Sequence, residues 1–106
     1  MKTDNQTRKL YRRIGHKLHP VLIISNGVTE TVAAELERAL ADHELIKIRI
    51  NAEDREEKQH MLETLCRTHG AELIQLTGHI ALLYRPALKQ KRDLSNLVRF
   101  SELLSG

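Results

Sequence analysis

Apolar residues recur in the first part of the chain at the spacing of one helix face, at Leu10, Tyr11, Ile14 and Leu18. This period predicts a helix over residues 5–17, with Asp4 or Asn5 as its N-cap. Pro20 then favours an extended segment. The continuous apolar run Val21–Ile24 that follows is typical of a strand covered on both faces.

A second helix is predicted over residues 29–43, because one apolar stripe runs along it: Val28, Val32, Ala33, Leu36 and Leu40. Thr29 is a suitable N-cap for this helix. The next segment, residues 45–51, alternates cleanly. Isoleucines occupy positions 46, 48 and 50, and the cations Lys47 and Arg49 lie between them. This alternation predicts a strand with one solvent-exposed, positively charged face.

A third helix is predicted over residues 55–69 from the stripe Met61, Leu62, Leu65 and Cys66. Asp54 and Glu57 have the spacing of a capping box, with Asp in place of the usual Ser or Thr. Gly70 is suited to the C′ position. Because Cys66 lies on the apolar stripe, we interpret it as a small buried hydrophobe rather than a nucleophile.

Two further strands are predicted over residues 72–77 and 79–85, joined near Thr77-Gly78 as a hairpin. The element order is therefore α-β-α-β-α-β-β. Each β-α-β crossover should be right-handed and make its strands parallel, whereas the hairpin adds an antiparallel strand. We expect a single α/β domain over residues 1–86, with a mixed four-stranded sheet packed with helices. Residues 87–106 are basic and then amphipathic, which predicts a C-terminal extension that is either a short helix docked on the domain or a frayed tail. Of these two we favour the partial helix.

Size and composition fit one small domain. The chain has 106 residues, and 41% of them are hydrophobic. Its longest apolar runs are too short to cross a bilayer and no signal peptide is visible, so we expect no membrane partner. Cys66 is the only cysteine, which excludes an internal disulfide and favours a cytoplasmic location.

Charge is distributed unevenly, although the formal net charge is only +3. Residues 1–20 contain six basic residues against one acid, whereas residues 21–44 contain one basic residue against five acids. Residues 71–106 contain five basic residues against three acids. Such asymmetry indicates a polyanionic partner such as nucleic acid, and the alternative is a solvated basic helix.

Enzymatic and metal-binding chemistry find little support in the sequence. The acids within residues 53–57 cluster at a predicted helix start, where capping and the helix dipole account for them. The six histidines are scattered, and without a second cysteine they have no zinc-finger spacing. Ser25-Asn26-Gly27 lacks the long Gly-rich loop and the Lys-Ser/Thr of a P-loop. We therefore expect a non-catalytic protein without a metal or other cofactor.

The predicted strands also lack the aromatic platforms on which a sheet stacks RNA bases, since only Tyr84 among them is aromatic. Contacts to RNA would then rest on phosphates, 2′-hydroxyls and shape. The turn at residues 25–27 fits this mode, because it directs backbone N–H groups beyond a strand and beside the positive end of the next helix.

Four segments carry a recognisable pattern: Pro20–Glu30 (PVLIISNGVTE), His43–Arg49 (HELIKIR), Asp54–Glu56 (DRE) and Gly78–Pro86 (GHIALLYRP). Over residues 4–86 the chain resembles, in the same order, the CRM (chloroplast RNA splicing and ribosome maturation) domain, whose stand-alone bacterial form is the YhbY family. The resemblance implies RNA binding and a fold similar to the C-terminal domain of translation initiation factor three. For stand-alone bacterial members it implies association with precursors of the large ribosomal subunit.

The family's GxxG loop corresponds to Ile24-Ser25-Asn26-Gly27, and here the sequence departs from the pattern. Ile24 replaces the first glycine, and the segment from Pro20 to Gly27 is one residue shorter than the family's. Asn26 and Gly27 tolerate positive φ. Either the loop keeps its shape through these two residues or its contact with RNA is weakened, so we rank the loop below the basic face.

The favoured hypothesis is a non-catalytic, monomeric RNA-binding protein that binds ribosomal RNA in precursors of the large subunit and acts in ribosome assembly. Expected phosphate contacts come from the first helix and the second strand: Arg8, Lys9, Arg12, Arg13, Lys17, Lys47 and Arg49. The turn formed by Ser25, Asn26 and Gly27 would approach the RNA backbone. The second-rank candidates are Arg55, Lys58 and Arg85.

The alternative hypothesis is a protein-interaction module. It would use the acidic segment 30–44 and the amphipathic tail around residues 94–104. A small hydrolase has only scattered histidines and acids in its support.

Overall fold

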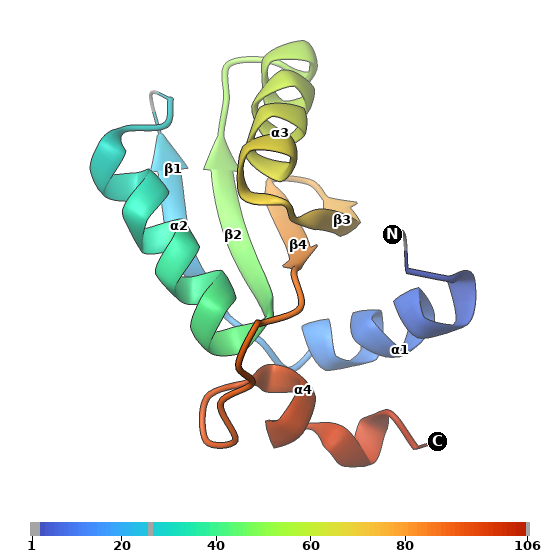
Figure 1. Ribbon diagram of the computed structural model, residues 1–106. Coiled ribbons are helices and arrows are strands. Elements are labelled where there is room, and N and C mark those ends of the chain that lie inside the picture. Colours follow the sequence, from blue (N-terminus) through green and yellow to red (C-terminus); the bar gives the residue numbers. More distant parts are fainter. Residues whose placement is uncertain (1–2, 26, 106) are drawn as a thin grey trace.

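The computed structural model describes residues 3–25 and 27–105, and its elements follow the predicted order. Figure 1 shows the helices α1 (Asn5–Gly15), α2 (Glu30–His43), α3 (Arg55–His69) and α4 (Asn96–Arg99) and the strands β1 (Pro20–Ser25), β2 (Leu45–Asn51), β3 (Glu72–Thr77) and β4 (Ile80–Tyr84). A 3-10 turn, η1 (Ser101–Leu103), follows α4.

The four strands form one mixed sheet in the order β1-β2-β4-β3. β1 and β2 are parallel, whereas β4 is antiparallel to both of its neighbours. The prediction of a single α/β domain with a mixed four-stranded sheet is confirmed. The hairpin partner β4 lies between β2 and β3, which places β3 at one edge of the sheet and β1 at the other.

A hydrophobic core lies on each face of the sheet. On the first face, α2 and α3 cover the strands (Figure 1), and Leu36 and Leu62 pack with Ile48. On the second face, Tyr11 and Ile14 of α1 pack against one half of the sheet together with the C-terminal extension. The other half of the second face is left open.

The open half contradicts one prediction. β1 is not covered on both faces, because the side chains of Val21 and Ile23 are 49% and 61% exposed. Only Leu22 and Ile24 of this run contact the first core. The apolar run indicated a central strand, but β1 is an edge strand and α1 does not extend over it.

Helix ends largely agree with the predicted caps. Asp4 accepts a hydrogen bond from the Thr7 backbone N–H at 2.7 Å, and Thr29 and Asp54 cap α2 and α3 in the same way. The capping box of α3 is displaced, because the Glu57 carboxylate accepts from the N–H of residue 53 rather than that of Asp54. α1 ends at Gly15, two residues before the predicted end.

Gly15 allows α1 to approach the sheet closely. A Cβ at this position would lie 2.9 Å from Cδ2 of Leu82 on β4, closer than two carbon atoms can be without a shift. The last turn of α1 is therefore fixed directly on the second face, and the residues that follow it run along the open half.

The C-terminal extension packs on the domain and forms the short helix that the sequence predicted. Leu97 and Phe100 join the second core. Buried Asn96 donates to the Leu45 carbonyl at 2.7 Å. No helix within residues 3–25 and 27–105 is long and apolar enough to cross a bilayer.

Candidate nucleic-acid interface

The open half of the second face combines cationic, polar and apolar side chains. We call it the open face, and its strand residues are Val21, Ile23, Ser25, Lys47, Arg49, Asn51, Gln75, Thr77 and Ile80. The strand register places Ile23 and Ile80 on either side of Arg49. The predicted exposed, positively charged face of β2 is therefore present, but only beyond Leu45, which α1 and the extension bury.

Arg49 is exposed and belongs to a chain of polar contacts at the carboxyl ends of β1 and β2. Its Nε donates to Oδ1 of Asn51 at 3.3 Å, and Nδ2 of Asn51 donates to Oγ of Ser25 at 3.1 Å. The sequence analysis did not single out Asn51, although the alternation of β2 places it on the same face as Arg49. These contacts connect the predicted turn residue Ser25 to the basic strand.

Lys47 is half-buried and borders two hollows. One, of about 340 Å³, lies between the end of α1 and the strands β3 and β4. The other, of about 200 Å³, lies toward α4. Among the described residues, Lys47 is thus the one cation that lines both of these hollows.

Most of the basic residues of α1 face solvent. Lys9, Arg13 and Lys17 are exposed and Arg12 is half-buried. Within the part of the chain that the structure describes, no hydrogen bond or ion pair joins these four side chains to another group. They are therefore accessible to a polyanion, and their contact with RNA stays a prediction.

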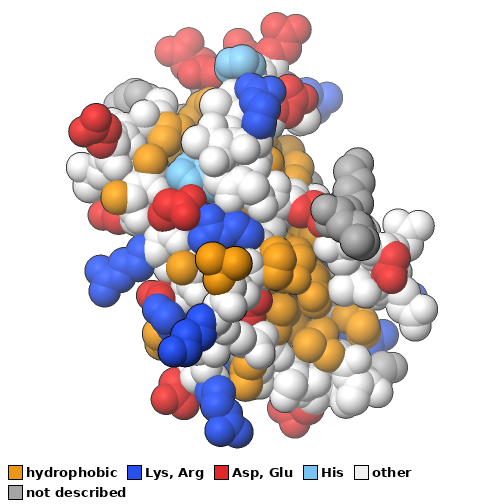
Figure 2. Space-filling view, in the orientation of Figure 1, with side chains coloured by type: hydrophobic (Ala, Val, Ile, Leu, Met, Phe, Trp, Pro, Cys, Tyr) orange, Lys and Arg blue, Asp and Glu red, His pale blue; other side chains and the backbone are white. Residues whose placement is uncertain are grey.

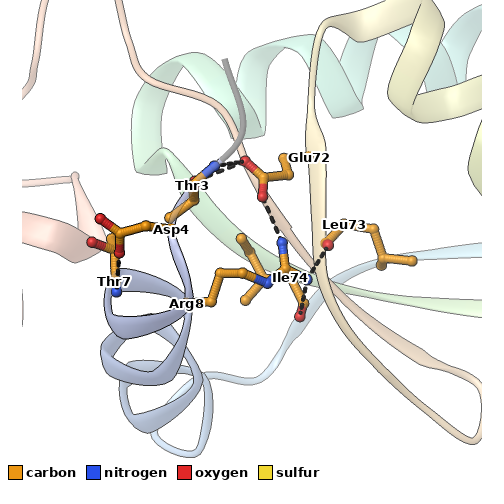
Figure 3. A network of polar contacts seen from close by, with 7 residues as sticks. All are labelled: Thr3, Asp4, Thr7, Arg8, Glu72, Leu73 and Ile74. Carbon is orange, nitrogen blue, oxygen red and sulfur yellow. Dashed lines mark hydrogen bonds and ion pairs between the residues drawn. The ribbon is translucent and has the colours of Figure 1, made fainter.

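Arg8, also predicted to contact phosphate, differs from its neighbours because it is partly buried and paired. Its Nη1 lies 2.5 Å from Oε2 of Glu72, and its Nη2 donates to the carbonyls of Leu73 and Ile74 at 3.0 Å each (Figure 3). Burial opposes ionisation of Glu72, but hydrogen bonds from Thr3 and the nearby Arg8 outweigh it and lower the pKa of this carboxyl. Arg8 joins α1 to β3, which accounts for its position without RNA.

The second-rank candidates do not form one group. Arg55 is exposed at the start of α3, at the end of the sheet where β1 and β2 finish. The Nζ of Lys58 donates to the Gly78 carbonyl at 2.7 Å. Arg85 lies beyond the other end of β4, where its Nη1 is 2.8 Å from Oε1 of Glu37. Arg55 and Lys58 therefore lie at the end of the sheet where β2 finishes, whereas Arg85 lies at the opposite end.

The turn after β1 is partly described. Ile24, at the position of the family's first glycine, is fully buried in the first core. Gly27 has a φ of +91°, and nothing lies within 4 Å of the position that a Cβ would occupy. Asn26, also predicted to contact RNA, lies outside the described residues. The turn thus replaces its first glycine by a core residue and keeps the last one in a conformation that favours glycine.

A larger hollow, of about 910 Å³, lies away from the open face, between α1, α3 and β3. Figure 2 shows an apolar patch there, and the Lys and Arg side chains on that side of the molecule are interspersed with acids. Cys66 lines this hollow and is half-buried rather than fully buried as predicted. Burial raises the pKa of its thiol, so the reactive thiolate is disfavoured.

The described residues contain no candidate metal site, because no three His, Cys, Asp or Glu side chains among them are grouped to hold an ion. The arrangement of the open face is instead that of a surface for a polyanion. It offers the two cations of β2, Lys47 and Arg49, exposed apolar side chains and amide and hydroxyl groups.

Comparison with known proteins identifies the family. Residues 3–85 match the CRS1/YhbY (CRM) domain. The chain belongs to the CRM domain family. It is 44% identical over 102 residues to a probable RNA-binding protein of Pseudomonas aeruginosa, covering 95% of this chain and 98% of the relative. It is 41% identical to an RNA-binding protein of Haemophilus influenzae, covering 86% and 93% of the two chains.

The fold also agrees with a solved structure. The solution structure of a hypothetical protein from Staphylococcus aureus superimposes with a TM-score of 0.73 at 26% identity, and the match covers 90% of this chain and 98% of the other. The CRM match ends at Arg85, so the extension that completes the second core lies outside it.

Proposed function

We propose that this CRM protein is a non-catalytic RNA-binding protein whose open face and α1 cations contact the RNA backbone. The observation that carries the proposal is that Lys47 and Arg49 lie on a half-face that no helix covers, and that Lys17 lines the same hollow as Lys47. The relatives described above are named as RNA-binding proteins rather than as enzymes, in agreement with this role.

Phosphate contacts are the main expected interaction. Lysine and arginine release counterions when they bind RNA, and this supplies sequence-independent affinity. The exposed Ile23 and half-buried Ile80 beside Arg49 give the face an apolar component that suits ribose and base edges. Arg55, at the start of α3, extends the cationic surface beyond the end of β2.

The RNA we favour is ribosomal RNA in precursors of the large ribosomal subunit, bound by a monomer during assembly in the cytoplasm. Support for this finer statement comes from the CRM family match and from the resemblance of the chain to stand-alone bacterial members. The protein-interaction alternative loses part of its basis, because the apolar residues Leu97 and Leu104 of the tail pack on the domain itself.

A double charge reversal tests the proposal. We expect Lys47→Glu/Arg49→Glu to weaken binding to a structured ribosomal RNA fragment and to reduce the slope of log K against log salt by about 1.4–1.8, the value for two lost phosphate contacts. Filter binding or fluorescence anisotropy at four salt concentrations measures both quantities.

The matched control is Arg38→Glu/Arg67→Glu, which reverses two exposed arginines on α2 and α3. It changes the net charge equally but leaves the open face intact. Equal slopes for the two double variants would refute the assignment of the open face. Sucrose-gradient fractionation of cell extracts then tests the ribosomal part: the Lys47/Arg49 variant should leave the large-subunit precursor fractions, whereas the control variant should remain in them.

A further inference from the structure

The hollow of about 200 Å³ beside Lys47 is lined by cations from three elements that are distant in the sequence. Lys17 follows α1, Lys47 lies on β2 and Arg99 ends α4. The imidazoles of His19 and His43 complete its polar side. Among the described residues that line this hollow, none is acidic.

Arg99 is held in place by the docking of the extension. Its Nη1 donates to Oδ1 of Asn96 at 3.0 Å, and its guanidinium carbon lies 5.4 Å from the centre of the Phe100 ring. Asn96 is buried and donates to the Leu45 carbonyl. The guanidinium is thereby connected to β2, the strand that carries Lys47.

His43 connects the same region to the loop before α4, because its Nδ1 lies 2.8 Å from the Leu94 carbonyl oxygen. Contacts between the extension and the domain therefore hold several of the residues that line the hollow. A free tail would not place Arg99 opposite Lys17.

We propose that this hollow is an RNA phosphate site, and that the C-terminal extension completes it with Arg99. The inference rests on the RNA binding proposed for the open face. Three cations from distant parts of the chain, in a lining without an acidic residue, suit a phosphodiester, since an arginine donates two parallel hydrogen bonds to phosphate oxygens and a lysine supplies a point charge. Lys47 borders both this hollow and the open face, so one RNA strand passes from the open face into the hollow.

The test compares Arg99→Gln with Arg67→Gln, an exposed arginine of α3 that does not line the hollow. We expect Arg99→Gln to reduce the salt slope for the ribosomal RNA fragment by about 0.7–0.9, and Arg67→Gln to leave it unchanged. Arg99→Lys should retain most of the slope, because it keeps the charge while losing the paired donors.

A measurement on the unaltered protein avoids any effect of the substitution on folding. Bound RNA should protect Arg99, but not Arg67, from modification by phenylglyoxal, as read by mass spectrometry. Equal modification of Arg99 with and without RNA, or equal salt slopes for the two glutamine variants, would overturn the assignment of the hollow as a phosphate site. RNA binding by the open face would still stand. If the wild-type protein bound no RNA, both proposals would fail.

Discussion

Arg8 and Lys9 are adjacent cations with opposite environments. The Arg8 side chain is 25% exposed and its ion-pair partner Glu72 is 17% exposed, whereas Lys9 faces solvent. A partly buried guanidinium with three acceptors is far more costly to remove than a solvated ammonium, because its partners lose their hydrogen bonds without regaining water. At the residue scale, burial rather than charge therefore separates the structural cation from those that we propose to contact RNA.

We predict that Arg8→Gln lowers the free energy of unfolding by about 1–3 kcal/mol, because Glu72 and two carbonyls of β3 lose a charged donor. Lys9→Gln should change it by less than about 0.5 kcal/mol. Urea unfolding followed by circular dichroism measures both. If Arg8→Gln were as stable as Lys9→Gln, the ion pair would contribute nothing, and Arg8 would return to the RNA-binding candidates.

At the element scale, the sequence predicted every helix and strand but not the environment of each. Periodicity and caps located α3 correctly because its stripe and Gly70 are local signals. The exposure of β1 depends on the strand order and on how far α1 reaches, and both follow from contacts between residues distant in the sequence. The same reason hid the pairing of Arg8 with β3 and the contribution of Arg99 to the hollow beside Lys47.

The extension is held by a residue that periodicity does not mark. Glu44 links α2 to β2, is buried, and has a φ of +63°, unusual for a residue other than glycine. Its carboxylate accepts hydrogen bonds from the Ala87 N–H at 2.8 Å, the Gln90 Nε2 at 2.6 Å and the Ser95 Oγ at 2.7 Å. This single side chain therefore fixes the loop that leads into α4.

We predict that Glu44→Ala lowers the free energy of unfolding by about 2–4 kcal/mol, since buried donors of the extension lose their acceptor. Amide hydrogen exchange in residues 96–104 should accelerate more than exchange in β2 and β4. Glu35→Ala, an exposed glutamate of α2, is the control and should leave both quantities unchanged. Uniform exchange across the extension and the sheet in Glu44→Ala would show that the carboxylate does not hold the extension specifically.

At the scale of the whole molecule, ion pairs and the aromatic core set opposite limits to stability. Hydrogen bonds from His69 and Arg85 lower the pKa of Glu37, and a hydrogen bond from Lys91 lowers that of Asp42. A lowered folded pKa stabilises the protein above the unfolded value, and this stabilisation is lost as the pH falls through the folded value. Glu37 joins α2 to α3 and β4, so its protonation weakens contacts between elements.

The alkaline limit comes from Tyr11, whose ring centre lies 4.9 Å from that of Tyr84 in the second core. Burial chiefly raises the pKa of Tyr11 well above its ordinary value of 10.0, so the folded state favours the neutral phenol. The stabilisation that the neutral phenol contributes is fully present below pH 10. It falls as the pH rises above 10, by up to about 1.4 kcal/mol per pH unit for one proton.

We predict a melting temperature that is flat near neutrality, drops below about pH 4.5 and drops again above about pH 10. Tyr11→Phe should reduce the drop above pH 10 and leave the acidic drop unchanged. The substitution removes one phenol but keeps every lysine, so any difference at alkaline pH comes from Tyr11. Thermal melts followed by circular dichroism between pH 2 and 11 measure the profile, and an unchanged alkaline limb in Tyr11→Phe would show that the phenol does not set this limit.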